Sequence, residues 1–138
     1  MALNSVFVDT SFFKAIIDPK DDFYQEGKEI LNKLQKEKVT LVTSNYVLDE
    51  SFTLIRKRCG QDMVDKFRKD LSKSAMVVII IRVTVSDESE AWNWFLLDWS
   101  DLSFTDCVSF AVMKRLSINR AATFDQHFQR AGFKIEES

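Results

Sequence analysis

Apolar positions along this chain follow two spacings. Short continuous runs rich in Val, Ile and Phe are typical of buried strands, whereas apolar residues three or four positions apart indicate helices that bury one face. The runs predict strands at residues 5–9, 39–43, 76–85, 121–124 and 133–135. The helical spacing predicts helices at residues 12–17, 23–37, 45–58, 62–73 and 126–130. Two further helices are predicted, one that Ser86 caps and that continues past Trp92, and one that begins at Ser103.

Strands and helices therefore alternate along the sequence. This order predicts an α/β fold with a central, parallel-dominated sheet and helices on both of its faces. The β-branched run at residues 77–81 is typical of a strand that is covered on both faces. The chain has 138 residues, three glycines, one proline and neither an internal repeat nor a linker, so residues 1–138 are expected to form a single domain.

Composition excludes several classes of protein. The longest uncharged apolar run has seven residues, whereas a membrane-spanning helix needs about 20. Two cysteines and one histidine cannot build a disulfide framework or a four-ligand zinc site. No basic segment precedes an apolar one at the N-terminus, so no signal peptide is expected. We therefore expect a reduced, cytoplasmic protein without a membrane partner.

Four acidic residues that are far apart in sequence are predicted to meet at one edge of the sheet. Asp9 and Asp125 end strands, Asp106 lies in the first turn of a helix, and Glu50 lies about one and a half turns into the helix after the second strand. The carboxyl ends of parallel strands and the starts of the following helices share one edge, where open α/β sheets bind their ligands. Carboxylates gathered there repel one another, so such a cluster raises its own pKa values or binds a cation.

Each acid also has a simpler explanation. Asp106 and Ser103 form a Ser-x-x-Asp capping pair, Asp125 suits the N-cap of a short helix, and Glu50 is compatible with a solvated helix face. Asp9 suggests a function more directly, because it ends an apolar strand and is followed by Thr and Ser. If the four acids meet, hard ions such as Mg²⁺ or Mn²⁺ suit their oxygens. Such ions promote attack of water on a phosphodiester.

Four segments carry a resemblance to a known family. They are Val-Asp-Thr-Ser at residues 8–11, Thr-Ser-Asn-Tyr-Val-Leu-Asp-Glu at 43–50, Leu-Ser-Phe-Thr-Asp-Cys at 102–107 and Thr-Phe-Asp-Gln-His-Phe at 123–128. In this order, and across essentially the whole chain, they resemble the four acidic motifs of the PIN-domain nucleases. The small single-domain form is similar to the VapC toxins of VapBC toxin–antitoxin pairs.

The resemblance implies an endoribonuclease that uses Mg²⁺ or Mn²⁺ and hydrolyses RNA phosphodiesters. Water would be the nucleophile, so no side chain is needed for that role. The family's catalytic and metal-binding acids fall on Asp9, Glu50, Asp106 and Asp125, and its supporting hydroxyl residue falls on Ser11 or Thr10. His127 is expected to pack within its motif or lie at the surface rather than act as a base.

Charge is unevenly distributed, although the net charge is only −2. Residues 56–73 carry seven basic and three acidic side chains, whereas residues 87–106 carry six acidic side chains and no Lys or Arg. Two solvated helix faces would explain this pattern. If RNA is the substrate, the candidates for a rim that contacts its phosphates are Arg56, Arg58 and Arg68, with Lys14 and Arg115 as helpers.

The resemblance also implies partners: an RNA substrate, a second copy of the chain in a homodimer, and a cognate antitoxin protein. Independent support for a protein partner comes from Trp92, Trp94 and Trp99, which lie close to Phe95, Leu96 and Leu97. On one helix these side chains cannot all face one core, which leaves apolar surface for a partner. A Trp-rich core helix with a scattered exposed ring is the alternative.

Other functions remain open or are disfavoured by particular residues. A catalytically silent PIN domain that binds RNA or protein is the main alternative. A haloacid-dehalogenase-type phosphohydrolase needs Asp-x-Asp at the strand end, whereas residues 9–11 are Asp-Thr-Ser. A receiver domain needs an Asp at the end of the third strand, whereas residues 84–86 are Thr-Val-Ser. Transfer RNA, a ribosomal loop and messenger RNA all remain possible targets.

Overall fold

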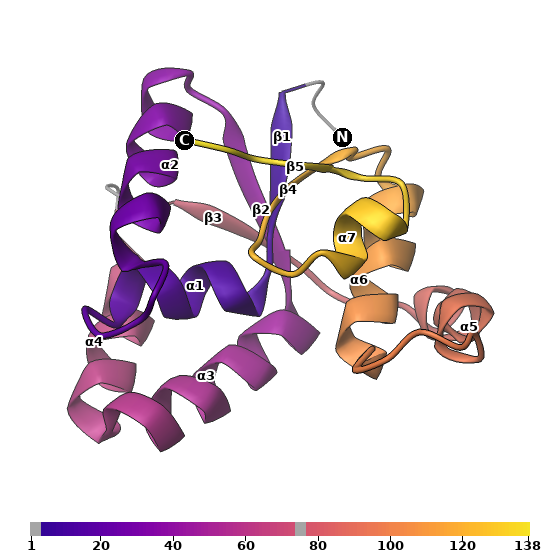
Figure 1. The fold of residues 1–138 in the computed structure, drawn as a ribbon, viewed down its shortest axis with the longest axis horizontal. Helices are drawn as coiled ribbons and strands as arrows, with labels where there is room; N and C mark the ends of the chain where they lie inside the picture. Colours follow the sequence, from indigo (N-terminus) through magenta and orange to yellow (C-terminus); the bar gives the residue numbers. More distant parts are fainter. Residues whose placement is uncertain (1–3, 74–76) are drawn as a thin grey trace.

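A five-stranded sheet runs through the centre of the computed structural model, which describes residues 4–73 and 77–138 (Figure 1). The strands are β1 (Ser5–Val8), β2 (Thr40–Ser44), β3 (Val78–Ile81), β4 (Arg120–Ala122) and β5 (Lys134–Ile135). They lie in the order β3-β2-β1-β4-β5, and all four pairings between neighbours are parallel. The expected α/β fold with a parallel-dominated sheet is confirmed.

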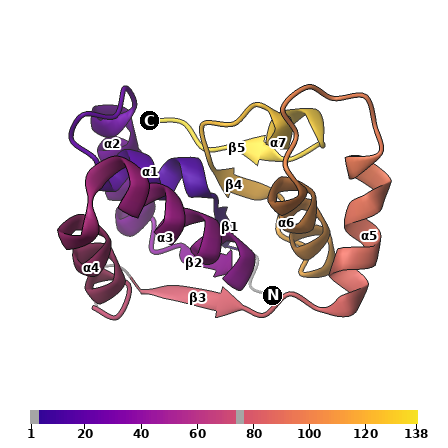
Figure 2. The same cartoon turned by 90° about the horizontal axis from the view of Figure 1, so that it is seen from below.

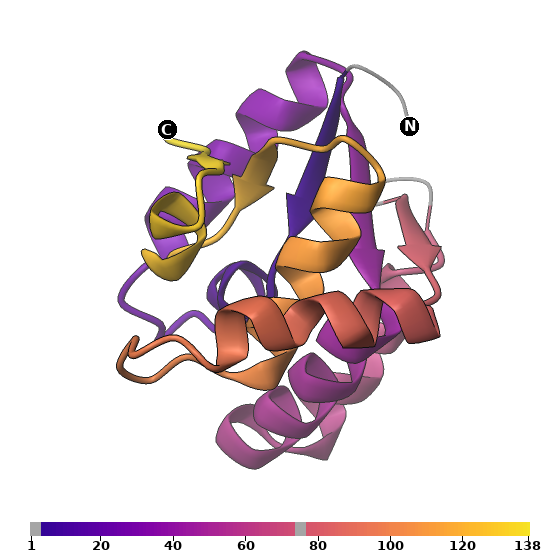
Figure 3. The ribbon, with the colours of Figure 1, turned by 90° about the vertical axis from the view of Figure 1, so that its right-hand side faces the viewer.

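Helices cover both faces of this sheet. They are α1 (Thr10–Ile17), α2 (Tyr24–Lys36), α3 (Asn45–Cys59), α4 (Gln61–Asp70), α5 (Val85–Phe95), α6 (Phe104–Arg115) and α7 (His127–Arg130). Helices α1 and α2 lie on one face and α6 on the other, as Figure 2 shows. Helix α5 lies outside α6, in front of it in Figure 3. Within residues 4–73 and 77–138, no helix has the length and apolarity that crossing a membrane requires.

The core is densest around the central strand β1 and helix α6. All four residues of β1 are buried, because β1 has a strand on each edge and helices on both faces. Helix α6 is buried along eight consecutive residues, from Asp106 to Met113. Phe110 in its middle contacts the rings of Trp94, Phe128 and Phe133. This packing on several sides fixes the first turn of α6.

Reciprocal side-chain caps define where α5 and α6 begin. At α6, the Ser103 hydroxyl accepts from the N–H of Asp106, and the Asp106 carboxylate accepts from the N–H of Ser103. Thr84 and Asp87 form the same pair at α5. Ser103 is therefore confirmed as the start of its helix, but the prediction of Ser86 as the other cap is wrong. The cap is Thr84, because the acid that completes a capping box lies three residues after it.

The prediction for residues 76–85 is wrong in both length and environment. Met76 lies outside the described residues, and the strand spans only Val78–Ile81. It lies at an edge of the sheet, where it pairs with β2 alone, and Ile79 and Ile80 are 41% and 44% exposed. A β-branched run indicates a strand, but the position of that strand in the sheet depends on long-range pairing. The strand ends where its partner does, since Ile81 pairs with Ser44, the last residue of β2. The N–H of Val83 then donates to Asn45 at the start of α3.

Several turns and helix starts gather at the carboxyl edge of the sheet, toward the bottom of Figure 1. Strand β1 leads through Asp9 into α1, and β2 leads directly into α3, whose N-cap is Ser44. Strand β4 leads through residues 123–126 into α7. Helix α3 runs below this edge, and the first turn of α6 lies beside it. The edge therefore brings together the segments that contain the four predicted acids.

Candidate active site

Asp9 is held in place by two elements that are far apart in sequence. It is 3% exposed and caps α1. Its Oδ2 atom accepts hydrogen bonds from the N–H and the hydroxyl of Ser11, at 3.4 and 2.9 Å. The hydroxyl of Thr123, directly after β4, donates to the same oxygen at 2.9 Å. One oxygen of the Asp9 carboxylate is thus fixed by hydroxyl groups from both sides.

The two hydroxyls also connect Asp9 to the segment that carries Asp125. Each hydroxyl has one proton, which it donates to Asp9. Ser11 Oγ then accepts from the N–H of Phe124 at 2.9 Å, and Thr123 Oγ1 accepts from the N–H of Asp125 at 3.0 Å. Sequence analysis identified Ser11 but missed Thr123. Thr123 directly follows β4, which pairs with β1. Its closeness to Asp9 can therefore be inferred only when the strand order is known.

The second oxygen of Asp9, Oδ1, is buried and has no hydrogen-bond partner among the described residues. Burial raises the pKa of Asp9 to about 6 from 3.8, against the opposing effect of hydrogen bonds from Thr123, Ser11 and the Thr10 backbone. A buried, unpartnered carboxylate oxygen costs free energy unless a proton or a cation compensates it. Asp9 therefore presents an open ligand atom.

Asp106 lies at the start of α6, 5% exposed. Burial raises its pKa to about 8, and the negative charges of Asp9, Asp125 and Glu50 contribute in the same direction. The hydrogen bond from the N–H of Ser103 opposes this shift. The charges of the other three predicted acids therefore act on Asp106, which is both a capping residue and a member of the acidic cluster.

Asp125 is held by His127. Its Oδ1 atom accepts from the N–H of His127 at 2.9 Å, and the Nδ1 atom of the His127 ring lies 2.9 Å from the same oxygen. The Nε2 atom lies 2.8 Å from the carbonyl oxygen of Ser100, which can only accept, so Nε2 carries a proton. Asp106, Asp125 and His127 each offer one ligand atom, and these atoms lie within 4.8 Å of one another. The His127 ring thus contacts Asp125 inside its motif and Ser100 outside it.

Glu50 and Thr10 have less direct places in this arrangement. Glu50 is half-buried on α3, and its charge contributes to the raised pKa of Asp106. The hydroxyl of Thr10 donates to the carbonyl oxygen of Val47 at 3.4 Å and accepts from Ser51 at 3.3 Å. Thr10 therefore joins α1 to α3 and its side chain makes no hydrogen bond to the acids.

Among the described residues, no Lys or Arg forms a hydrogen bond or an ion pair with any of the four acids. Asp9, Asp106 and Asp125 are instead held by hydroxyls and backbone N–H groups. Negative charge in a low-dielectric site without a matched side-chain cation is relieved by protons or by a metal ion. An oxygen-rich donor set of this kind suits a hard divalent cation.

The basic residues expected at the rim have different surroundings. Arg56 and Arg58 are exposed near the end of α3, and exposed Arg68 on α4 forms an ion pair with Asp65 at 2.6 Å. The two further candidates are engaged in ion pairs with neighbouring acids. Lys14 contacts Asp18 and Asp21, and Arg115 contacts Asp87, each at 2.8–2.9 Å. Their role is to connect elements of the fold.

The whole chain has relatives among characterised proteins. A PIN-domain family model matches residues 6–134. The chain is 35% identical over 133 residues to the 23S rRNA-specific endonuclease VapC20 of Mycobacterium tuberculosis, in two strains of that organism. The match covers 93% of this chain and 95% of the relative.

Solved structures agree with this assignment. The crystal structure of M. tuberculosis VapC20, described as a toxin that cleaves the sarcin–ricin loop, superposes with a TM-score of 0.80 and 35% identity over 93% of this chain and 95% of that one. FitAcB from Neisseria gonorrhoeae has a TM-score of 0.68 at 14% identity, covers 96% of both chains and supports the fold alone. Together with the geometry of the acidic edge, these matches show that the chain belongs to the PIN-domain family.

Proposed function

We propose that this protein is a divalent-metal-dependent endoribonuclease and the toxin of a VapBC-type pair. The observation that carries the proposal is the buried Oδ1 atom of Asp9, which has no partner among the described residues. It lies in a cluster whose acids pair with no Lys or Arg in residues 4–73 and 77–138. The relationship to a 23S rRNA endonuclease over nearly the whole chain supports the same activity.

The residues that would hold Mg²⁺ or Mn²⁺ are Asp9, Asp106 and Asp125, with Glu50 completing the set. The open oxygen of Asp9 and the oxygen-only character of these four acids fit such an ion. When bound, the ion would supply Lewis-acid stabilisation of the phosphoryl oxygens and activation of water. The Nδ1 atom of His127 is close enough to Asp106 and Asp125 to join the set.

The chain itself contributes the positions of these groups. Ser11 and Thr123 orient the Asp9 carboxylate so that one oxygen stays open, and the α6 cap orients Asp106. The backbone N–H of His127 holds one oxygen of Asp125. A preorganised site of this kind lowers the cost of reorganisation during the reaction. Hydrolysis by water needs no side-chain nucleophile.

The proposed substrate is a ribosomal RNA loop. The VapC20 relative is named for cleavage of 23S rRNA, and its structure is described as that of a sarcin–ricin-loop-cleaving toxin. At 35% identity over 93% of the chain, a related loop is the first substrate to test. Ribosomes also place the proposed site of action in the cytoplasm.

A second copy of the chain is the proposed partner on α5. Trp94 packs on Phe110 in the core, but Trp92, Leu96 and Leu97 are 49%, 78% and 46% exposed. An apolar surface on one helix and the residues after it suits a homodimer interface. A cognate antitoxin is proposed as a further protein partner, on the basis of the family.

The activity is tested by incubating the protein with a synthetic sarcin–ricin hairpin in Mn²⁺, in Mg²⁺ and in EDTA. We expect cuts in either metal, none in EDTA, and a loss of at least about a hundredfold in Asp106→Asn, because one oxyanion ligand is removed. Exposed Asp101→Asn is the matched control and keeps full activity. Binding without cleavage in every metal would instead indicate a silent RNA-binding PIN domain, and cuts that persist in Asp106→Asn would exclude this site.

The raised pKa values predict how the metal-free protein responds to pH. Because the folded-state pKa of Asp106 is about 8 and that of Asp9 about 6, the folded protein binds more protons than the unfolded chain between about pH 4 and pH 8. Stability contributed by these protonated groups is therefore lost as pH rises through that window. In EDTA, we expect Tm to fall between pH 5 and pH 8 by at least about 3 °C more in the wild type than in Asp106→Asn.

Asp101→Asn controls for the loss of a carboxylate, since its backbone φ of 59° also suits Asn. This variant should follow the wild-type pH dependence. The same change of Tm with pH in the wild type and in Asp106→Asn would contradict the raised pKa of Asp106.

The proposed dimer is tested by sedimentation velocity. We expect Leu96→Glu to convert the dimer to a monomer, because a charge on an apolar interface is costly to desolvate. Val77→Glu replaces another exposed apolar residue next to β3 and should leave the dimer intact. A monomeric wild type, or an unchanged dimer in Leu96→Glu, would exclude an α5 interface.

A further inference from the structure

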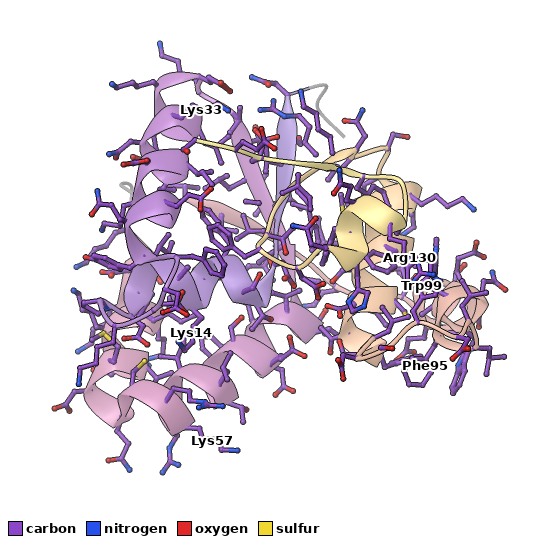
Figure 4. The ribbon with its side chains drawn as sticks, in the orientation of Figure 1. Lys14, Lys33, Lys57, Phe95, Trp99 and Arg130 are labelled. Carbon is purple, nitrogen blue, oxygen red and sulfur yellow. The ribbon has the colours of Figure 1, made fainter. Side chains whose placement is uncertain are left out.

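A column of three side chains extends from the acidic site to the surface. The His127 ring, which contacts Asp125, stacks on the Trp99 ring with 6.2 Å between centroids and 10° between planes. The Arg130 guanidinium carbon lies 4.5 Å from the centroid of the Trp99 ring. Trp99 and Arg130 lie next to each other beside α7 in Figure 4. The column thus connects an acid of the site to an arginine on α7.

Arg130 is a cation without a competing partner. Within the described residues, its guanidinium forms no hydrogen bond or ion pair, and the side chain is exposed. Other Lys and Arg side chains of the described residues are neutralised by ion pairs; these are Lys14, Arg68, Lys69, Lys73, Lys114, Arg115 and Arg120. A guanidinium that is held over a ring keeps its N–H groups available for an anion.

Two side chains contact the Trp99 ring. The His127 ring stacks on it, and the Arg130 guanidinium lies over it. The Trp99 ring therefore supports the guanidinium. Ser100, the next residue, accepts from His127 at 2.8 Å, so the connection between α5 and α6 is fixed to α7 at two adjacent residues.

A cation at this position solves an electrostatic problem of the proposed function. RNA is a polyanion, and the four acids repel it until their charge is compensated. Arg130 is five residues after Asp125 and is connected to it through the rings of Trp99 and His127. Arg56 and Arg58, by contrast, lie at the C-terminal end of α3. Their neighbour Lys57 lies well apart from Trp99 and Arg130 in Figure 4.

We propose that Arg130, supported by Trp99, binds a phosphate that flanks the scissile bond of the RNA. This inference rests on the proposed ribonuclease function and names a substrate contact for the same site. Arginine suits the role because its planar guanidinium can hold two phosphate oxygens at once. Arg130 is thus a substrate-binding residue, and Trp99 is a positioning residue that acts through it.

The test measures hairpin binding to full-length Asp106→Asn protein in Mg²⁺ by fluorescence anisotropy, between 50 and 200 mM salt. Adding Arg130→Gln should weaken binding about tenfold at the lowest salt, and should reduce the slope of log Kd against log salt by about 0.7. Adding Trp99→Leu should weaken binding less and keep the slope, because the charge remains. In otherwise wild-type protein, Arg130→Gln should raise KM and leave kcat nearly unchanged.

Arg58→Gln tests the competing rim candidate on α3. Lys36→Gln is the matched control, since it removes one exposed cation from the end of α2, outside the candidate rim residues. It should leave affinity and slope unchanged, and Tm should confirm that each variant is folded. An unchanged slope in Arg130→Gln, with cleavage by the wild type intact, would overturn this inference alone. A reduced slope in Arg58→Gln only would place the phosphate contact on α3. Absence of both binding and cleavage in otherwise wild-type protein would overturn the proposed function together with this contact.

Discussion

Burying carboxylates without matched cations is the constraint on which this structure depends. Asp9 and Asp106 are almost fully buried. Burial, together with the charges of Asp9, Asp125 and Glu50, raises the pKa of Asp106 to about 8. An isolated buried charge is costly. Such a cluster is therefore stable only if hydrogen bonds from the fold hold the carboxylates or a bound ligand compensates their charge. Here the fold supplies hydrogen bonds to one oxygen of Asp9 and leaves the other open. The proposed metal binding, pH dependence and catalysis all depend on this difference between the two oxygens of Asp9.

The same residues that end strands and begin helices also form the site. Asp9 caps α1, Asp106 completes the α6 cap, and Asp125 holds the first residue of α7. A structural reading and a functional reading of each acid are therefore compatible, because a cap engages only part of a carboxylate. Packing of α6 around Phe110 holds its first turn in place, so the core contributes directly to the geometry at the edge.

Much of this arrangement could be predicted from the sequence, because parallel strands and their following helices place their junctions at one edge. That rule predicts that the acids at positions 9, 50, 106 and 125 meet. It cannot supply the strand order, so the apolar run at residues 77–81 predicts a strand covered on both faces, whereas β3 is a partly exposed edge strand. Thr123, Trp99 and Arg130 were missed as parts of the site for the same reason, since their contacts join segments that only the folded chain brings together. Lys14 and Arg115 show the converse: charge alone suggested a rim, whereas local acids engage both side chains.

The central claim is that the open oxygen of Asp9 is a metal ligand. Calorimetric titration of Mn²⁺ into the wild type, Asp9→Asn and Asp49→Asn tests it most directly, because binding is measured without RNA. Asp49 is an exposed acid on α3, next to Glu50, and serves as the matched control. We expect one saturable binding event in the wild type and in Asp49→Asn, and at least about a tenfold loss of affinity in Asp9→Asn. Equal affinity in Asp9→Asn and the wild type would contradict it.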